Sequence, residues 1–163
     1  MFVQCLQADV NMKLIEGKKA PAFTGITRKG SVSLKDYKGK NVVLYFYPRD
    51  NTPGCTVEAV EFTAAQKDFT KENTVILGVS RDTVASHEGF CKKQSLTIDL
   101  ISDEDLTIHK AYGVWGDKSF MGRAFKGTIR STFLINEKGI ITKIWSPVKV
   151  KDHVRKVLQA LTL

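Results

Sequence analysis

A strand pattern, a turn and a helical pattern follow one another directly between residues 42 and 69, and this order strongly restricts the fold. Residues 42–47 are apolar, β-branched and aromatic, which predicts a buried strand. Two prolines and a glycine then interrupt regular structure. From Thr56 onward, apolar residues recur at roughly helical spacing. Cys55 is therefore expected in the first turn of a helix, at the carboxyl end of a central strand.

The start of a helix favours the reactive form of a cysteine. Unpaired N–H groups and the positive end of the helix dipole stabilise the thiolate, which is the nucleophile. Three residues before Cys55, where a disulfide oxidoreductase would have a second cysteine, this chain has Thr52. A threonine cannot form a disulfide, but its hydroxyl can hydrogen-bond beside the sulfur. The site therefore suits a thiolate that attacks a small polar substrate, in a loop that Pro48 and Pro53 stiffen and screen from water.

Further strand and helix patterns alternate along the rest of the chain. Strands are predicted at 75–80, 131–136 and 140–145, and helices at 84–93, 104–112 and 151–161. Asp82 or Thr83 is expected to cap the first of these helices, and Ser102 the second. Early alternation followed by a late hairpin and helix indicates an α/β fold, with a central mixed β-sheet flanked by helices. Such sheets form their sites at the carboxyl ends of strands, where Cys55 is expected.

Four large apolar residues follow the helix predicted at 104–112, and they either line a substrate channel or pack in the core. They are Trp115, Phe120, Met121 and Phe125. We favour packing, except where the glycine-rich loop expected over residues 116–127 borders the active site.

Length and composition are typical of one soluble globular domain. The chain has 163 residues, of which 42% are hydrophobic and 26% charged. No apolar run approaches the ~20 residues that span a bilayer, so no membrane association is expected. The first residues lack the basic and long apolar regions of a secretory signal. Because Met12 resembles a natural start, residues 1–11 are interpreted as an N-terminal extension to a single domain of residues 12–163.

The cysteines and histidines do not form a metal-binding pattern. Cys5, Cys55 and Cys91 contain no CxxC pair, and the three histidines are isolated in the sequence. This spacing argues against a zinc site and against the disulfide framework of a secreted protein. GxGxxG, P-loop and HExxH motifs are also missing from the sequence, so no cofactor or metal is expected. A catalytic thiol in a reducing cytoplasm fits best.

The chain is basic, with 25 Lys and Arg residues and a formal net charge of +8. Such a charge can indicate nucleic-acid binding. However, the basic residues are spread along the chain and usually lie near acidic ones. Solvated faces and active-site cations are therefore the better interpretation, and nucleic acid is not an expected partner.

The segment around Cys55 resembles a known family. Pro48-Arg49-Asp50-Asn51-Thr52-Pro53-Gly54-Cys55 matches the PxxxTxxC pattern of peroxiredoxins. With its flanks, the segment is similar to the peroxiredoxin Q subfamily, also called bacterioferritin comigratory protein. The likeness continues, in order, at residues 78–80, 100–103, 112–116 and 129–135. It covers residues 12–163 and implies a thioredoxin-like fold and a thiol-dependent peroxidase of hydroperoxides.

The resemblance implies a role for each matched residue. Cys55 is the peroxidatic nucleophile, which attacks a hydroperoxide and becomes a sulfenic acid. Thr52 hydrogen-bonds the peroxide, and Pro48 limits solvent access. Arg130 brings its guanidinium to the sulfur, where it favours the thiolate. Together with the N–H groups of Gly54 and Cys55, Thr52 and Arg130 polarise the O–O bond.

Glu58, one turn after Cys55, has two interpretations. It bonds to an arginine and orients it, or it is a first-turn acid that responds to the helix dipole. The sequence alone does not separate the two.

The cysteine that resolves the sulfenic acid is identified by resemblance as well. Many members of the subfamily carry it five residues after the nucleophile, where this chain has Val60. Cys91, on the predicted 84–93 helix, matches a branch that carries it further along. This implies an intramolecular Cys55–Cys91 disulfide, which a dithiol protein such as thioredoxin reduces. The alternatives are a buried core thiol at Cys91 and, more weakly, resolution by Cys5.

A disulfide requires Cα atoms within about 7 Å of each other. In the reduced form both cysteines are expected in packed helices, which hold their Cα atoms farther apart than this. We therefore expect the first turn around Cys55 and the helix of Cys91 to unwind on oxidation. Two other functions stay open at this point. One is a one-cysteine peroxidase in which Cys91 is structural, and the other is a non-enzymatic redox-sensing, chaperone-like or nucleic-acid-binding protein. Because an intramolecular disulfide needs no partner subunit, a monomer is expected.

Overall fold

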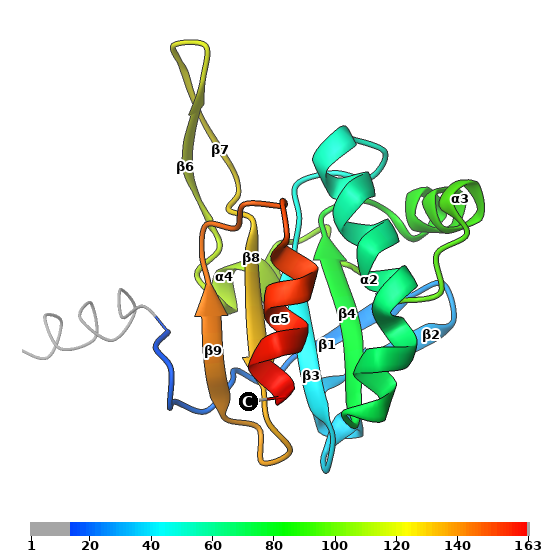
Figure 1. The fold of residues 1–163 in the computed structure, drawn as a ribbon. Helices are drawn as coiled ribbons and strands as arrows, with labels where there is room; N and C mark the ends of the chain where they lie inside the picture. Colours follow the sequence, from blue (N-terminus) through cyan, green and yellow to red (C-terminus); the bar gives the residue numbers. More distant parts are fainter. Residues whose placement is uncertain (1–13, 163) are drawn as a thin grey trace, which may run out of the picture.

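The computed structural model describes residues 14–162, so the extension proposed for residues 1–11 lies outside the described part of the chain. Its main feature is a seven-stranded sheet with the order β2-β1-β5-β4-β3-β8-β9 (Figure 1). The strands of this sheet are β1 (Thr24–Thr27), β2 (Gly30–Ser33), β3 (Asn41–Phe46), β4 (Thr74–Ser80), β5 (Asp99–Ser102), β8 (Ser131–Ile135) and β9 (Ile141–Trp145). A separate two-stranded sheet consists of β6 (Trp115–Phe120) and β7 (Arg123–Thr128). The helices are α2 (Pro53–Lys71), α3 (Val84–Gln94), α4 (Thr107–Ala111) and α5 (His153–Thr162), with a 3-10 helix η1 at Leu34–Tyr37.

Strand directions in the main sheet are mixed, as predicted. β3 runs parallel to β4 and β4 runs parallel to β5, whereas β8 is antiparallel to both β3 and β9. β1 and β2 form an antiparallel hairpin at the edge next to β5. The sequence did not indicate this hairpin, because its strands, TGIT and GSVS, lack an alternation of apolar and polar residues.

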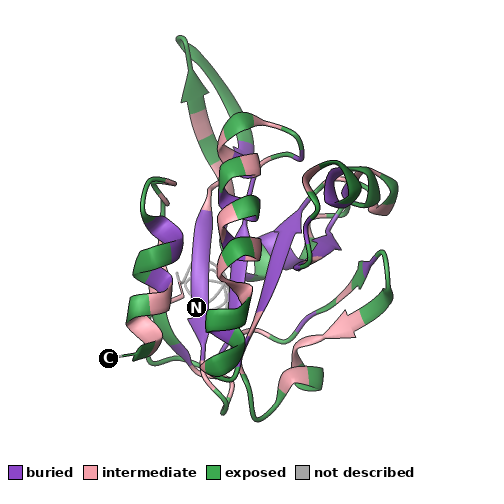
Figure 2. Cartoon of the chain, turned by 45° about the vertical axis from the view of Figure 1, so that its right-hand side comes forward, coloured by how far each residue is buried: buried purple, intermediate pink, exposed green. Residues whose placement is uncertain are grey.

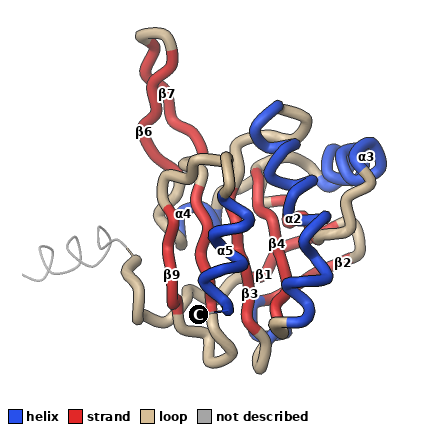
Figure 3. Tube along the Cα trace, in the orientation of Figure 1, coloured by secondary structure: helices blue, strands red, loops and turns tan. Residues whose placement is uncertain are grey.

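Helices cover both faces of the main sheet. α2 and α5 pack side by side on one face, and α4 lies on the other (Figures 1 and 3). β3 supplies both cores, since Val43 and Tyr45 face α2 and α5 while Val42 and Leu44 face the opposite side. Figure 2 shows the central strands as buried. Burial on both faces explains the continuous apolar run at 42–47. No helix within residues 14–162 is long and apolar enough to cross a membrane.

The prediction of a helix at 104–112 with Ser102 as its cap is wrong at the start of the helix. Ser102 is the last residue of β5, and α4 begins well after residue 104. The carboxylate of Asp103 accepts the N–H groups of Ile108 and His109, at 3.1 and 2.8 Å. One carboxylate with two acceptor oxygens therefore binds the free N–H groups of this short helix, and a serine cap is not needed.

The glycine-rich stretch 116–127 is a hairpin and not a loop, because β6 and β7 pair along its length. The hairpin projects away from the body of the protein (Figure 1). Phe120, Met121 and Phe125 are 69%, 87% and 47% exposed. The prediction that these three residues pack in the core is therefore wrong, since a projecting two-stranded ribbon has no interior. Trp115, at the base of the hairpin, is partly buried as expected.

Gly78, in the middle of β4, is expected not to tolerate a side chain. A Cβ atom there would lie 2.8 Å from Leu100 Cδ2 and 2.8 Å from Tyr45 Cζ, both in the core. We expect Gly78→Ala to lower the free energy of unfolding by about 1–3 kcal/mol. At Gly89, in α3, nothing lies within 4 Å of the added Cβ, so Gly89→Ala should raise it by roughly 0.5–1 kcal/mol. Urea unfolding checks both, and equal effects of the two variants would contradict the prediction.

Candidate active site

Cys55 lies in the first turn of α2, as predicted. Thr52 is the N-cap residue and Pro53 the first helical residue, a position at which the missing N–H would have no helical partner. Cys55 is 1% exposed, and its thiol is free. The unpaired N–H groups and the positive end of the helix dipole favour negative charge on this sulfur.

Arg130, directly before β8, brings a positive charge to the same sulfur. Its Nη2 donates a hydrogen bond to Cys55 Sγ at 3.3 Å, and its Nη1 donates to Glu58 Oε1 at 2.7 Å. Burial works against the charged guanidinium, but the negative charges of Cys55 and Glu58 raise the pKa of Arg130. The guanidinium therefore stays charged beside the sulfur and stabilises the thiolate.

Glu58 binds the other terminal nitrogen of the guanidinium. It is fully buried, and of the two arrangements that the sequence left open, the structure has the one in which Glu58 bonds to an arginine. Its second carboxylate oxygen, Oε2, has no hydrogen-bond partner among residues 14–162. Burial raises the pKa of Glu58 to about 7, although Arg130 acts in the opposite direction. Glu58 therefore takes up a proton near neutral pH.

The raised pKa of Glu58 predicts a pH-dependent stability. Between its ordinary pKa of 4.5 and about 7, the unfolded chain ionises Glu58 while the folded protein keeps the proton. The Glu58 contribution to the free energy of unfolding should therefore fall by about 3 kcal/mol as pH rises through this window. His153 has the opposite effect, because burial lowers its pKa from 6.5 to about 4. The contribution of His153 to the free energy of unfolding is therefore lost as pH falls through this range.

The variant Glu58→Gln separates these opposing contributions. The difference in free energy of unfolding between wild type and variant should shrink by about 3 kcal/mol from pH 4.5 to 7.5, measured by urea unfolding at closely spaced pH values. Glu88→Gln, at an exposed position on α3, is the control and should give a flat difference. A flat difference for Glu58→Gln as well would show that Glu58 titrates alike in both states.

Thr52, Gly54 and Pro48 surround this charged centre. Thr52 Oγ1 donates to the carbonyl oxygen of Arg49 at 2.9 Å, so its lone pairs can accept the hydrogen of a hydroperoxide. At Gly54, a Cβ atom would lie 3.3 Å from Arg130 Nη2, and glycine therefore leaves room for the guanidinium. Pro48 is partly buried at the edge of a groove.

The groove next to Pro48 has a volume of about 440 Å³ and runs between the active-site loop and the base of the β6–β7 hairpin. Its other lining residues are Arg49, Arg81, Asp82, Trp115, Phe125, Lys126, Gly127 and Thr128. Lys118, on β6, donates to Thr128 O at 2.9 Å. Burial and the charge of Arg130 lower the pKa of Lys118, while the charge of Cys55 raises it, so this lysine also lies in the field of the site. The base of the hairpin therefore borders the active site.

Cys91 lies on α3, within the core. The helix begins as predicted, with Thr83 Oγ1 accepting the N–H of Ser86 at 3.0 Å. Cys91 is 3% exposed, its thiol is free, and burial raises its pKa. Cys55 and Cys91 belong to the same hydrophobic core. The two sulfurs are not bonded to each other.

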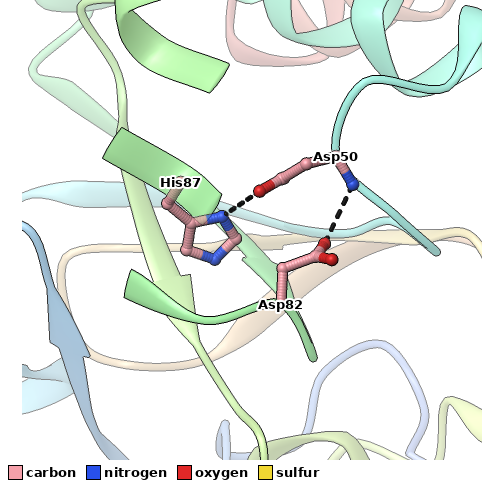
Figure 4. Close-up of side chains that lie close together, drawn as sticks. All are labelled: Asp50, Asp82 and His87. Carbon is pink, nitrogen blue, oxygen red and sulfur yellow. Dashed lines mark hydrogen bonds and ion pairs between the residues drawn. The ribbon is translucent and has the colours of Figure 1, made fainter. Parts of the chain in front are cut away.

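Asp50, Asp82 and His87 form a polar cluster that the sequence did not indicate (Figure 4). They come from the loop after β3, the loop after β4 and α3, and the histidine looked isolated in the sequence. Their nitrogen and oxygen atoms lie within 4.8 Å of one another. The carboxylates already accept hydrogen bonds from three neighbouring hydroxyl groups, so the cluster is a closed network. The only sequence signal was that both aspartates follow parallel strands and must meet at one edge of the sheet.

Comparison with known proteins identifies the family of the chain. The model of the AhpC/TSA family matches residues 16–144, which is most of the chain. The chain belongs to this family.

Relatives narrow the class to peroxiredoxins. A Coxiella burnetii relative is 46% identical over 92% of this chain and 100% of its own length. The peroxiredoxin Bcp of Bacillus subtilis is 44% identical over 89% of this chain and 93% of its own. The solved peroxiredoxin Q of Xanthomonas campestris superposes with a TM-score of 0.82 at 40% identity, covering 86% of this chain and 89% of that one. These likenesses confirm the peroxiredoxin Q resemblance, the thioredoxin-like fold and the assignment as a thiol-dependent peroxidase.

Proposed function

We propose that Cys55 is the peroxidatic cysteine of this peroxidase and that Thr52, Arg130 and Pro48 act on the bound peroxide. The observation that carries the proposal is the 3.3 Å contact from Arg130 Nη2 to Cys55 Sγ at the start of α2. Two sources of positive potential, the helix start and the guanidinium, meet at one buried sulfur. A thiol with a purely structural role needs neither.

In the first step, the Cys55 thiolate attacks the terminal oxygen of a hydroperoxide. An S–O bond forms, the O–O bond breaks, and the electron pair of the broken bond leaves on the departing oxygen, which takes up a proton as water or an alcohol. Thr52 holds the peroxide, while Arg130 and the N–H groups of Gly54 and Cys55 stabilise the charge that develops on the oxygens. Glu58 keeps the guanidinium in place, and Pro48 limits access of bulk water.

In the second step, Cys91 resolves the Cys55 sulfenic acid. Its sulfur attacks Cys55 Sγ, the S–S bond forms, the S–OH bond breaks, and the hydroxyl leaves as water with the proton of the thiol. Solved structures of Xanthomonas campestris peroxiredoxin Q include two cysteine-to-serine variants. The two substituted positions are separated in sequence by the same number of residues as Cys55 and Cys91 in this chain. Because Cys91 is buried in α3, we expect this helix to unwind before the two sulfurs meet.

The substrates we propose are hydrogen peroxide and alkyl hydroperoxides. A solved Xanthomonas campestris bacterioferritin comigratory protein is described by its alkyl peroxide reduction activity. In this chain, Trp115 and Phe125 give the groove beside Pro48 an apolar wall that suits an alkyl group. Thioredoxin or a similar dithiol protein would reduce the disulfide. We further propose that the protein works in the cytoplasm as a monomer, without nucleic acid or membrane.

Peptide mapping under non-reducing conditions tests these assignments. The protein is treated with one equivalent of hydrogen peroxide, digested, and analysed by mass spectrometry. A linked Cys55–Cys91 peptide is the expected result. A Cys55 sulfenic or sulfinic acid with free Cys91 would make the enzyme a one-cysteine peroxidase, and an unmodified Cys55 would refute its catalytic role.

A further inference from the structure

We propose that the ion pair between Asp50 and His87 is a latch, which holds α3 against the active-site loop and sets how fast Cys91 reaches Cys55. The inference rests on the proposed function, in which Cys91 resolves the sulfenic acid. Asp50 lies in the loop between β3 and α2, and His87 lies on α3, one helical turn before Cys91. The pair therefore joins the two segments that carry the reacting sulfurs.

The latch consists of two adjacent α3 residues that bind one carboxylate. His87 Nδ1 lies 2.7 Å from Asp50 Oδ2, and the two side chains are 1% and 2% exposed (Figure 4). Ser86 Oγ donates to the same Oδ2 atom at 2.8 Å. The first turns of α3 are thus tied directly to the loop that leads into Cys55.

His87 carries a proton on both ring nitrogens. Nδ1 faces the Asp50 carboxylate, and Nε2 lies 3.2 Å from the backbone carbonyl oxygen of Ile101. Both of these groups can only accept, so both nitrogens donate. Although burial would raise the pKa of Asp50, hydrogen bonds from His87 and Tyr47 hold it below its usual range. The contact is therefore a buried pair of opposite charges, in which either charge left alone is strongly unfavourable.

The loop has a second anchor that does not involve α3. The N–H of Asp50 donates to Asp82 Oδ2 at 2.9 Å, and Asp82 also accepts from Ser80 Oγ at 2.7 Å. Ser80 is the last residue of β4, and Asp82 lies in the loop that follows this strand. When α3 unwinds, the loop can stay attached to the sheet while only the contacts to α3 break.

Because α3 is by itself a helix of low stability, the contacts of the latch affect how readily it unwinds. His87 and Cys91 are four residues apart on one helix face, so moving Cys91 toward Cys55 also displaces His87. Gly89 lies between them, and a glycine inside a helix lowers helix stability. Breaking the ion pair is thus a step toward the disulfide. It determines how long the Cys55 sulfenic acid survives, and so how much of it a second peroxide oxidises to sulfinic acid.

The variant His87→Gln tests the latch by removing the imidazolium charge. After a pulse of hydrogen peroxide, rapid quenching and mass spectrometry follow the first-order conversion of Cys55 sulfenic acid to the Cys55–Cys91 disulfide. We expect the rate constant to rise about tenfold or more. With excess peroxide, the fraction of sulfinic acid should fall accordingly. Ser86→Ala removes a single hydrogen bond from the same carboxylate and should raise the rate constant roughly threefold.

The chain offers a matched control in the pair of His109 and Asp103. Their Nδ1–Oδ2 distance is 2.6 Å and they are as deeply buried, but they lie at the start of α4 on the opposite face of the sheet. His109→Gln should leave the rate constant of disulfide formation unchanged. Hydrogen exchange of the amides in α3 should become faster in His87→Gln and stay unchanged in His109→Gln.

Each outcome decides the proposal. An unchanged or slower disulfide step in His87→Gln and Ser86→Ala overturns the latch but leaves the peroxidase intact. Equal acceleration by His109→Gln also overturns it, because general loosening of the fold would then be the cause. If His87→Gln does not fold, Ser86→Ala carries the test alone. A wild-type protein that forms no Cys55–Cys91 disulfide overturns both the latch and the proposed role of Cys91.

Discussion

Replacing Arg130 by glutamine should slow the oxidation of Cys55 by hydrogen peroxide about a hundred- to a thousand-fold. The guanidinium contacts the sulfur at 3.3 Å and is held there by Glu58 at 2.7 Å. In the proposed mechanism it stabilises both the thiolate and the charge on the departing oxygen, and glutamine keeps a donor but removes the charge. Arg130→Lys should recover only part of the rate, because an ammonium group cannot bind sulfur and carboxylate with the fixed geometry of a guanidinium.

Stopped-flow tryptophan fluorescence after mixing reduced protein with peroxide measures this second-order rate constant. Arg155→Gln is the control, since Arg155 is exposed on α5 and pairs with Asp152. Its rate constant should equal that of the wild type. A rate constant for Arg130→Gln within a few-fold of wild type would refute the role assigned to the Arg130–Cys55 contact.

Replacing Cys91 by serine should stop thioredoxin-dependent turnover after one oxidation of Cys55. The first oxidation does not involve Cys91, so its rate constant should be unchanged. The Cys55 sulfenic acid then has no intramolecular partner, and it should accumulate and proceed to the sulfinic acid when peroxide is in excess. NADPH consumption in the presence of thioredoxin and its reductase measures turnover, and mass spectrometry of the Cys55 peptide identifies its oxidation state.

The matched control for this prediction is Cys5→Ser, which also removes one thiol but lies outside the residues that the structure describes. It should turn over like the wild type. If Cys91→Ser retains full turnover while Cys5→Ser loses it, Cys5 is the resolving residue. If both variants retain it, the enzyme works with one cysteine and Cys91 is a core thiol.

The local part of the site was predictable from sequence, because adjacent residues determine it. A buried strand, a proline turn and a helical pattern placed Cys55 at the start of α2, where the structure has it. The contact to Arg130 joins residues that are 75 positions apart in the sequence, so it has no local signal. It was expected only because the segment before β8 resembles peroxiredoxin Q. For the same reason, the partner of Glu58 stayed open until the structure showed the ion pair.

Other features depended on tertiary structure in ways that periodicity does not record. The β6–β7 hairpin has aromatic residues that resemble core positions, yet no layer covers it among the described elements. His87 and Asp50 each looked unremarkable in sequence, because their pairing depends on how α3 returns to the edge of the sheet. α4 is so short that a single carboxylate, Asp103, sets its start.

Met121, at the tip of the hairpin, is 87% exposed. A hydroperoxide that meets its thioether yields a sulfoxide, which adds one oxygen atom, the same gain in mass as a sulfenic acid on Cys55. Only peptide-level analysis can therefore assign such a gain. The two products also differ in what restores them, because a dithiol reduces oxidised Cys55 whereas the sulfoxide needs a dedicated reductase. Over many catalytic cycles the active-site cysteine is reduced again each time. The sulfoxide at the hairpin tip instead accumulates with the total amount of peroxide to which the protein has been exposed.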